Sequence, residues 1–265
     1  MIVWLRIGFI AVAIVAVSIV LLPLQCICLY FDWKPRRYLP RLWHRTICFL
    51  FGIRIRIAGR LESRRPLMLA SNHASWLDIM VLSAVADVAF IAKSEVRTWP
   101  IFGTLARLQK SVFIAREQKR KTGSQVNEIA ERLAGGEIMV LFPEGTTSDG
   151  NRLLEVKSSL FGAATAAVPH SPTGTVYVQP VAIAYSGIHG IAMGRYHRPI
   201  AAWPGDIELL PHLKGILQCG AIDVDVCFGE AVEYDAETNR KEASAAIARR
   251  IRNLLASKLR GREIA

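Results

Sequence analysis

The chain has 265 residues, of which 33 are Lys or Arg and 22 are Asp or Glu, so its formal net charge at pH 7 is +11. This length allows one domain of ordinary size together with an appendage. Residues 1–65 hold 11 basic and 2 acidic side chains, whereas the rest of the chain is nearly neutral. Because the excess charge surrounds a long apolar segment, it argues against nucleic-acid binding and for a membrane surface as partner.

The N-terminal segment predicts a membrane anchor. Residues 7–31 are apolar with four interruptions, of which Pro23 is the one most disruptive to a helix. A bilayer is spanned by about 20 apolar residues, so this segment is long enough. Arg6 precedes it, whereas five basic residues follow within residues 34–45. The positive-inside rule therefore places the main domain in the cytoplasm, although Pro23 leaves open a broken helix that enters one leaflet only.

Residues 38–59 mix apolar and aromatic side chains with arginines. Such a segment is either an interfacial element at the headgroup layer or an ordinary buried element with basic ends. Because it follows the anchor, we favour the first interpretation. We assign residues 1–58 to a membrane anchor with a basic interfacial segment, and residues 59–265 to one folded domain. The five cysteines include no Cys-x-x-Cys pair, which indicates reduced side chains and a cytoplasmic domain.

Beyond the anchor, short apolar runs alternate with helical patterns. We expect strands over residues 54–57, 67–71, 89–92, 111–115, 138–142, 177–185 and 223–228. We expect helices over residues 75–86, 100–109, 123–134, 154–167 and 237–259. This alternation predicts an α/β fold, with a largely parallel sheet flanked by helices and an N-terminal membrane-anchoring helix. Residues 223–228 alternate polar and apolar side chains, which predicts a strand with one solvated face.

Residues 71–78, SNHASWLD, carry the first candidate site. Ser75-x-x-Asp78 is typical of a capping box at a helix N-terminus, and a lone His73 in a turn is most often structural. However, His73 follows an apolar strand, and ligands bind beyond the carboxyl ends of parallel strands. Asp78 could accept a hydrogen bond from the imidazole and leave its other nitrogen free to take a proton.

The second candidate is residues 140–150, VLFPEGTTSDG. A strand ends before Pro143, and Glu144 and Gly145 follow at its carboxyl end. A polar strand-to-loop turn explains the same residues. The chain has no Gly-x-Ser-x-Gly, so no serine nucleophile elbow is indicated, and no Cys/His spacing predicts a metal site.

The third candidate is Arg116, which follows the apolar run VFIA. An arginine at a strand end can hold an anionic headgroup through paired hydrogen bonds. Taken alone, Arg116 is better interpreted as a solvated residue at the start of a basic run.

Four ordered blocks resemble the glycerolipid acyltransferases, the family of 1-acyl-glycerol-3-phosphate acyltransferases. The resemblance covers roughly residues 50–230. The blocks are Asn72-His73-x4-Asp78, Phe113-Ile114-x-Arg116, Phe142-Pro143-Glu144-Gly145-Thr146 and Val178-Gln179-Pro180-Val181-Ala182-Ile183. Four blocks in order outweigh the structural interpretation of each one alone.

The resemblance implies acyl transfer from a thioester, on acyl carrier protein or coenzyme A, to a lipid hydroxyl, with no further cofactor and no metal. It implies that His73 is the general base and that Asp78 orients it. The acceptor side would be formed by the remaining residues of the blocks and their neighbours, namely Asn72, Lys93, Arg116, Glu144, Gly145, Thr146 and Thr147. Because a thioester is already activated, the hydroxyl needs only deprotonation and positioning.

Thr147 departs from the family pattern, in which phosphate-binding members continue Phe-Pro-Glu-Gly-Thr with Arg. A hydroxyl in place of a cation weakens anion recognition. The run from Glu144 to Asn151 resembles the branch that includes bacterial lyso-ornithine lipid acyltransferases. Arg116 favours lysophosphatidate as acceptor, whereas Thr147 favours a lyso-ornithine lipid.

We therefore interpret the chain as an O-acyltransferase on the cytoplasmic face of a bacterial inner membrane, adding a fatty acyl chain to a lyso-lipid. The alternative from another class is a non-catalytic lipid-binding or tethering protein. A lipid hydrolase would need a nucleophile that the motifs do not offer. The sequence further predicts that His73→Ala and Asp78→Ala each abolish transfer and leave folding intact.

Overall fold

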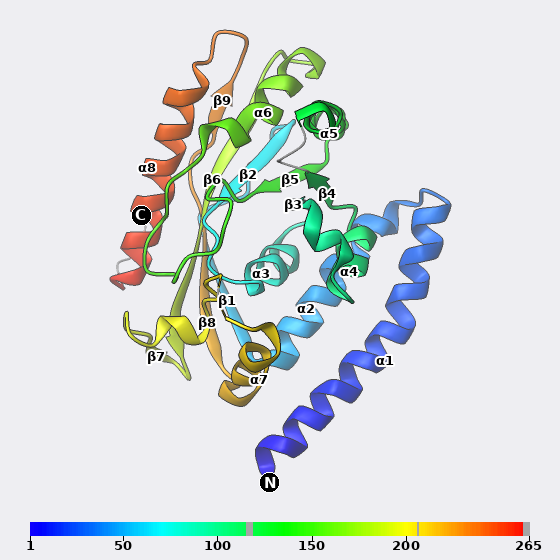
Figure 1. Cartoon of the computed structure of the whole chain (residues 1–265), viewed down its shortest axis with the longest axis vertical. Coiled ribbons are helices and arrows are strands. Elements are labelled where there is room, and N and C mark those ends of the chain that lie inside the picture. Colours follow the sequence, from blue (N-terminus) through cyan, green and yellow to red (C-terminus); the bar gives the residue numbers. More distant parts are fainter. Residues whose placement is uncertain (115–118, 206, 262–265) are drawn as a thin grey trace.

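The computed structural model describes residues 1–114, 119–205 and 207–261. Figure 1 shows a twisted sheet between two groups of helices, with the long helix α1 along one side of the domain. The helices are α1 (Ile2–Tyr30), α2 (Leu39–Phe51), α3 (Leu77–Val85), α4 (Phe102–Leu108), α5 (Lys119–Ala134), α6 (Gly162–Ala167), α7 (Leu209–Cys219) and α8 (Arg240–Leu259). The strands are β1 (Ile53–Ala58), β2 (Leu67–Ser71), β3 (Val88–Lys93), β4 (Val112–Ile114), β5 (Ile138–Leu141), β6 (Val176–Ile188), β7 (Ile191–Ala192), β8 (Ile222–Phe228) and β9 (Val232–Tyr234).

The strand order is β1-β8-β6-β2-β5-β3-β4, and β7 and β9 pair with β6. The pairs from β6 through β2, β5 and β3 to β4 are parallel, and so is β1 with β8. Strand β6 pairs antiparallel with β7, β8 and β9. The predicted α/β fold with a largely parallel sheet is therefore confirmed. The carboxyl ends of β2, β3 and β5 meet at one edge of the sheet.

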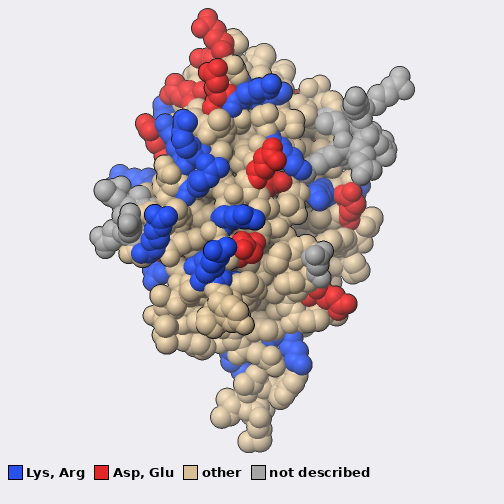
Figure 2. Space-filling model, turned by 60° about the vertical axis from the view of Figure 1, so that its left-hand side comes forward, with Lys and Arg blue, Asp and Glu red and all other residues tan. Residues whose placement is uncertain are grey.

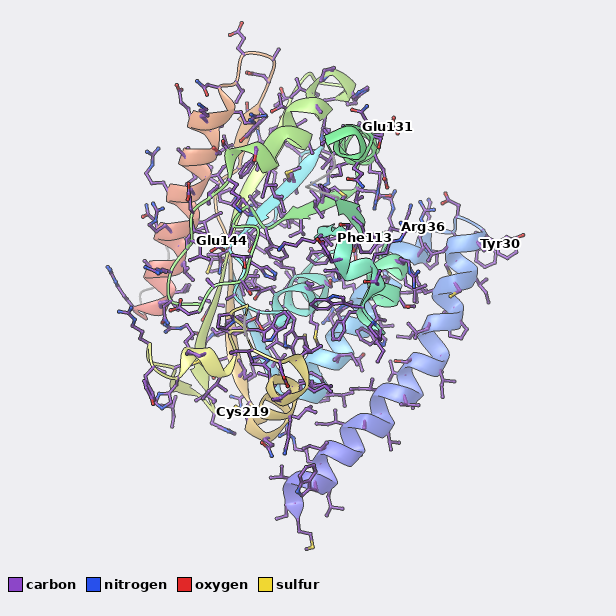
Figure 3. All side chains as sticks on the ribbon, viewed as in Figure 1. Tyr30, Arg36, Phe113, Glu131, Glu144 and Cys219 are labelled. Atoms are coloured by element: carbon purple, nitrogen blue, oxygen red, sulfur yellow. The ribbon has the colours of Figure 1, made fainter. Side chains whose placement is uncertain are left out.

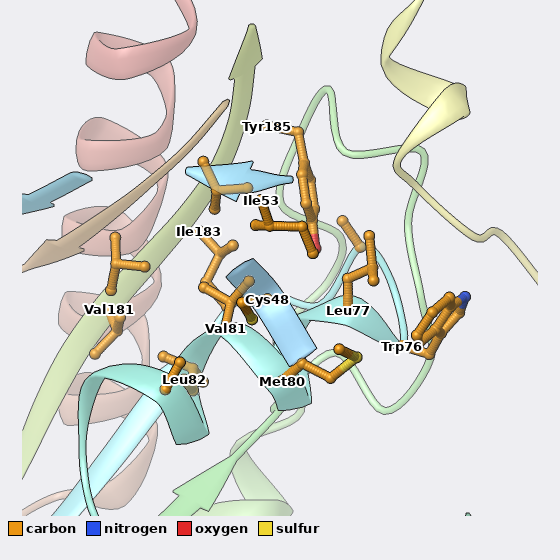
Figure 4. Close-up of a cluster of buried hydrophobic side chains, with 14 of the residues drawn as sticks. Cys48, Ile53, Trp76, Leu77, Met80, Val81, Leu82, Val181, Ile183 and Tyr185 are labelled. Carbon is orange, nitrogen blue, oxygen red and sulfur yellow. The ribbon is translucent and has the colours of Figure 1, made fainter. Parts of the chain in front are cut away.

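Both faces of the sheet are covered, as expected for parallel strands. In β2, Leu67 and Leu69 pack in the core with α2, α3 and α7, whereas Met68 and Ala70 pack in the core with α5, α6 and α8. All five residues of β2 are buried. Figure 4 shows the first core, where α3 lies against the sheet. These two packed layers hold the carboxyl end of β2 in a fixed position.

Helix α1 is long and apolar enough to cross a membrane, and it is mostly exposed. It runs without a break through Pro23. Near its start, the Arg6 guanidinium donates hydrogen bonds to the carbonyls of Leu217 and Gly220 at the end of α7. Both ends of α1 therefore contact the domain, because its C-terminal part packs beside α2 and α4.

The sheet extends past the boundary that the sequence predicts at residue 58. Strand β1 pairs along its whole length with β8. Helix α2 buries Ile47 and Phe51 in the core, while Phe49 on its other face is 81% exposed. The segment that we assigned to the interface is therefore buried on one side and exposed on the other, and α2 and β1 belong to the folded domain.

Two expected elements differ from the structure. The helix predicted over residues 154–167 begins only with the 3-10 turn Ser158–Phe161 and continues as α6, because the N–H groups of Leu154 and Lys157 bond to Glu144 and Pro143 instead. Strand β8 has no solvated face, since all its residues are buried. Its Asp225 pairs with Arg56 of the neighbouring edge strand, at 2.9 Å.

Lys and Arg side chains also gather on one outer face of the domain. Figure 2 shows this face, which carries α8. Helix α8 buries an apolar stripe that includes Ile247 and Ile251, and its remaining positions are rich in Lys and Arg. The basic character predicted for the N-terminal part is thus not confined to it.

Candidate active site

His73 and Asp78 lie at the carboxyl end of β2 and in the first turn of α3. The distance from His73 Nδ1 to Asp78 Oδ2 is 2.8 Å, so the hydrogen bond expected from the sequence is present. The Asp78 side chain is fully buried, whereas the His73 side chain is 18% exposed. Asp78 Oδ2 also accepts the N–H groups of Ala74 (2.7 Å) and Ser75 (2.9 Å). One oxygen thus fixes both the ring and the turn that carries it.

The capping box predicted at this turn is present only in part, because the N-cap residue of α3 is Trp76 and not Ser75. The Asp78 carboxylate accepts the Ser75 N–H, and Ser75 Oγ accepts the N–H of Leu77, the first residue of α3. Capping and orientation of the ring therefore use the same carboxylate.

Tyr185 is a buried partner that the sequence analysis does not identify. Its hydroxyl donates to Asp78 Oδ1 at 2.6 Å. Burial, and then the negative charge of Asp78, raise the pKa of Tyr185 well above its usual value, so the hydroxyl stays protonated. A buried tyrosine needs a hydrogen-bond partner for its hydroxyl, so a tyrosine in a strand as apolar as β6 indicates that such a partner exists. The sequence does not indicate which residue it is.

Glu144 lies behind the His73 turn. Its two carboxylate oxygens accept the N–H groups of His73 (2.6 Å) and Leu154 (2.7 Å), and the Ser148 N–H donates to the His73 carbonyl (2.8 Å). Burial raises the pKa of Glu144 to about 7, although the two N–H donors favour the ionised form. Figure 3 labels Glu144 in the interior of the domain. At 2% exposure, Glu144 holds two loops together and is not available to a substrate.

Asn72, for which a substrate contact was also predicted, is likewise enclosed by the protein. It is fully buried, its Nδ2 donates to the Ile183 carbonyl (3.0 Å), and its Oδ1 accepts the Ile183 N–H (2.8 Å). The side-chain amide continues the pairing of β2 with β6 past the end of β2. Asn72 thereby fixes the backbone directly before His73.

The His73 ring lies where two cavities meet. It stacks on Phe142, with ring centroids 4.0 Å apart and planes 14° apart. A cavity of about 190 Å³, lined mainly by apolar side chains such as Met80, Phe102 and Leu105, extends from His73 toward α2 and α4. A more open cavity of about 420 Å³ adjoins it. The two cavities share His73 and several neighbouring residues, among them Phe90, Trp99 and Trp203.

The open cavity brings together most of the predicted acceptor residues. Lys93, Gly145, Thr146 and Thr147 line it together with His73. Lys93 and Thr146 are exposed, and Thr147 is half-buried. Arg116 lies outside the described residues. The exposed predicted residues thus surround the ring, whereas Asn72 and Glu144 support it from behind.

Two tryptophans complete the rim of both cavities, and the sequence analysis did not identify them. Trp99 and Trp203 meet edge to face, with ring centroids 6.2 Å apart. The backbone N–H of Trp203 donates to the carbonyl of Ala74 (2.7 Å), which ties the rim to the His73 turn. No motif carries these residues, so only their aromatic character could have drawn attention to them.

The family model described as acyltransferase matches residues 52–184. The chain belongs to the acyltransferase family. It is 65% identical over 99% of its length to a lyso-ornithine lipid O-acyltransferase of Rhizobium meliloti (strain 1021), covering 90% of that protein. It is 55% identical over 98% of its length to a protein of the same name from Brucella abortus (strain 2308), covering 97% of it.

The fold of this acyltransferase is also that of a solved structure. The 1-acyl-sn-glycerophosphate (LPA) acyltransferase PlsC from Thermotoga maritima superposes with a TM-score of 0.64 at 22% identity, covering 100% of this chain and 97% of the other. At this identity the likeness shows the fold alone.

The geometry of this acyltransferase suits proton transfer. Because Asp78 can only accept at Nδ1 while it is ionised, the ring carries its proton on Nδ1 and leaves Nε2 as the acceptor. A ring held in this tautomer at the wall of a cavity can take a proton from an alcohol bound there.

Proposed function

We propose that this acyltransferase moves a fatty acyl chain from a thioester, on acyl carrier protein or coenzyme A, to the hydroxyl of a lyso-ornithine lipid. The observation that carries the proposal is the His73–Asp78 hydrogen bond at the junction of the two cavities. The names of the two relatives that match nearly the whole chain support the choice of acceptor.

In the proposed reaction His73 is the general base. Nε2 takes the hydroxyl proton while the acceptor oxygen attacks the thioester carbonyl carbon. The tetrahedral intermediate then collapses, the carbon–sulfur bond breaks, and the imidazolium returns the proton to the leaving thiolate. The products are the ester and the free thiol, and His73 ends in its starting state. Asp78 stabilises the transient imidazolium and holds the ring in place.

The walls of the site match the parts of the substrates. The apolar cavity beside His73 suits a hydrocarbon chain, because it removes methylene groups from water. The hydroxyls and N–H groups of Thr146 and Thr147, on the open side, are suitable donors to the oxyanion of the intermediate. His73 lies between the two walls, which is where the acyl carbonyl and the hydroxyl must meet.

The open side is also suited to a headgroup without a phosphate monoester. Thr147 offers a hydroxyl where a cation would be needed to bind two negative charges tightly. An ornithine headgroup carries both a carboxylate and an ammonium group, so it requires less cationic contact. Lys93, which is exposed on the same cavity, supplies one positive charge for that carboxylate.

The proposed location is the cytoplasmic face of a bacterial inner membrane. Helix α1 has the length and apolar character for membrane attachment. The exposed aromatic residues Tyr30, Phe31 and Trp33 at its end are of the kind that gathers at the membrane–water interface. Attachment would bring the active site to a surface where the lipid acceptor is concentrated.

Product analysis with purified full-length enzyme tests the proposal. The enzyme is given lyso-ornithine lipid or lysophosphatidate, each with acyl carrier protein or coenzyme A thioester, and the lipid products are identified by mass. We expect an ornithine lipid with two acyl chains, made at least tenfold faster than phosphatidate. If phosphatidate forms faster, lyso-ornithine lipid is not the preferred acceptor. If no lipid product forms and the donor is not consumed, the protein does not transfer acyl chains.

A further inference from the structure

A separate cleft lies at the opposite edge of the sheet, at the amino ends of β3 and β5. It has a volume of about 200 Å³ and is lined in part by Val88 and Ile138, the first residues of these strands. Lys93, at the other end of β3, lines the cavity beside His73. Because a strand rises about 3.3 Å per residue, roughly 17 Å separates the two sites. This cleft is therefore distinct from the open cavity beside His73, although Gln109 lines both the cleft and the apolar cavity.

The lining of the cleft is strongly basic. Its charged side chains are five cations and two carboxylates, an excess of three positive charges: Arg36, Arg37, Arg65, Lys110, Arg132, Asp87 and Glu137. Glu137 is engaged by neighbouring cations, whereas the buried Oδ1 of Asp87 has no hydrogen-bond partner among the described residues. Glu137 pairs with Arg132 (2.6 Å) and Lys110 (3.4 Å), and Asp87 lies 3.8 Å from Arg41.

The charges of Arg37 and Arg65 are offset at longer range, by Asp87 and Glu62 respectively, and not by a salt bridge within the described residues. In the part of the chain that the structure describes, neither guanidinium forms an ion pair with a carboxylate. Arg65 Nη1 donates to the carbonyls of Glu62 (2.7 Å) and Arg64 (2.8 Å), which fixes the group in place. Burial lowers the pKa of Arg65, and the nearby negative charge of Glu62 opposes this shift only in part.

The cleft also lies at the level of the membrane surface, if α1 attaches to the membrane as proposed above. Residues Lys34–Arg37 form the 3-10 turn that connects α1 to α2, directly after the exposed aromatic residues that end α1. Gln25 Nε2 donates to the carbonyls of Arg36 (3.0 Å) and Leu108 (2.8 Å), which holds this connection against α4. Figure 3 labels Arg36 and Tyr30 together at this corner, well apart from Glu144.

We propose that this cleft binds a phosphate group, and that the headgroup of an anionic phospholipid is the source best placed to reach it. Guanidinium groups bind phosphate oxygens through paired, charge-assisted hydrogen bonds, and the excess of positive charge in the cleft suits such an anion. The exposed Tyr38, also in the lining, adds a hydroxyl donor. The bound lipid would hold the α1–α2 corner at headgroup depth and so set the height of the active site above the bilayer.

Binding of short-chain lipids to the full-length protein in uncharged maltoside micelles tests this site. The ligands are dihexanoylphosphatidylglycerol, inorganic phosphate, and dihexanoylglycerol, which lacks the phosphate, each titrated by calorimetry without any acyl donor. We expect Arg37→Ala and Arg65→Ala each to weaken phosphatidylglycerol binding about fivefold, and the double variant on the order of 20-fold. The matched control is Arg249→Ala, an exposed arginine of α8, which should change the affinity less than about twofold.

The variants distinguish loss of the positive charge from disturbance of the local structure. The ligands distinguish a phospholipid headgroup from free phosphate. Arg65→Lys keeps the cation, so it should retain most of the affinity even if Arg65→Ala disturbs the local backbone. Competition between inorganic phosphate and the lipid supports recognition of the phosphate group itself. If inorganic phosphate binds and the lipid does not, the cleft is a phosphate site but the phospholipid headgroup is not its ligand. Equal binding by all variants, or equal binding of dihexanoylglycerol, overturns the proposal. The readout involves no acyl transfer, so it does not depend on the outcome of the product analysis.

Discussion

The two walls of the open cavity beside His73 differ in how firmly they are held. On one side, the turn from His73 to Asp78 is fixed by Glu144, Tyr185 and the N–H groups of the turn itself. On the other side, Lys93 and Thr146 are exposed. Proton transfer needs atoms placed within a fraction of an ångström, whereas recognition of a headgroup tolerates adjustable side chains at a rim. Substitutions in the two walls should therefore differ in effect. Those at the His73 turn should lower kcat, whereas those at the exposed wall should change which acceptor is preferred.

The largest effect is expected for His73→Ala. Loss of the base should lower kcat on the order of 10³-fold. Folding should be unchanged, because the ring lies at a cavity wall and is 18% exposed. Acyl transfer and the thermal midpoint are measured together, with the exposed His170→Ala as the matched control, which should behave as wild type. More than a tenth of wild-type activity in a folded His73→Ala protein would remove the base from the mechanism.

Asp78→Asn should affect both catalysis and folding. The carboxylate accepts four hydrogen bonds in a fully buried position, and an amide nitrogen in place of one oxygen would face donors. We expect a loss of about 2–4 kcal/mol in the free energy of unfolding and a fall in kcat on the order of 10²-fold. The structure thus corrects the expectation from sequence that replacing Asp78 leaves folding intact. Urea unfolding in micelles measures this, and unchanged stability would mean that the four bonds are not formed.

Glu144 predicts a pH dependence of stability. Burial raises its pKa to about 7 from 4.5, so the folded state holds the proton more tightly than the unfolded chain does. Its stabilising contribution is complete below pH 4.5 and is lost as the pH rises through 7. Relative to Glu144→Gln, the wild-type free energy of unfolding should therefore fall by about 3 kcal/mol between pH 4.5 and 7.5. Parallel stability curves for the two proteins across this range would contradict the raised pKa.

Tyr185→Phe removes one hydrogen bond from the rigid wall and keeps the ring. Asp78 retains its three N–H donors, so the loss of stability should be about 1 kcal/mol. We expect kcat to fall about tenfold or less, because Asp78 loses one of the contacts that fix it. A fall as large as that of Asp78→Asn would show that the hydroxyl does more than position the carboxylate.

The sequence predicts the local contacts of the active site better than its contacts with distant strands. The apolar strand before His73 and the spacing to Asp78 predict the end of β2, the start of α3 and their hydrogen bond, because these are local. Tyr185, the remaining partner of Asp78, and Ile183, the partner of Asn72, both lie in β6, more than 100 residues away. Strand pairing decides them, and no local pattern encodes it.

Burial is the second property that residue type alone does not reveal. Asn72 and Glu144 belong, like His73, to the blocks that resemble the family and were expected to contact substrate, yet both are enclosed and bond to backbone groups. Asp223 and Asp225 gave β8 an alternating pattern, but the edge strand β1 covers them with arginines. Polar residues in a motif therefore divide into those that reach the cavity and those that hold its wall, and packing makes the division.

The smallest effect is expected at the adjustable wall, for Thr147→Arg. Thr147 is half-buried on the open cavity with His73, so a longer cationic side chain can extend along this surface without disturbing the core. One added charge at a partly exposed site should improve kcat/KM for lysophosphatidate relative to lyso-ornithine lipid about fivefold to tenfold. Thr146→Arg places the same charge one residue away and serves as the matched control. An equal shift in both variants would assign the change to net charge at the rim, whereas an unchanged ratio in Thr147→Arg would exclude this residue as a determinant of the acceptor. A fall in kcat for both acceptors would mean that this loop, too, must be held as firmly as the His73 turn.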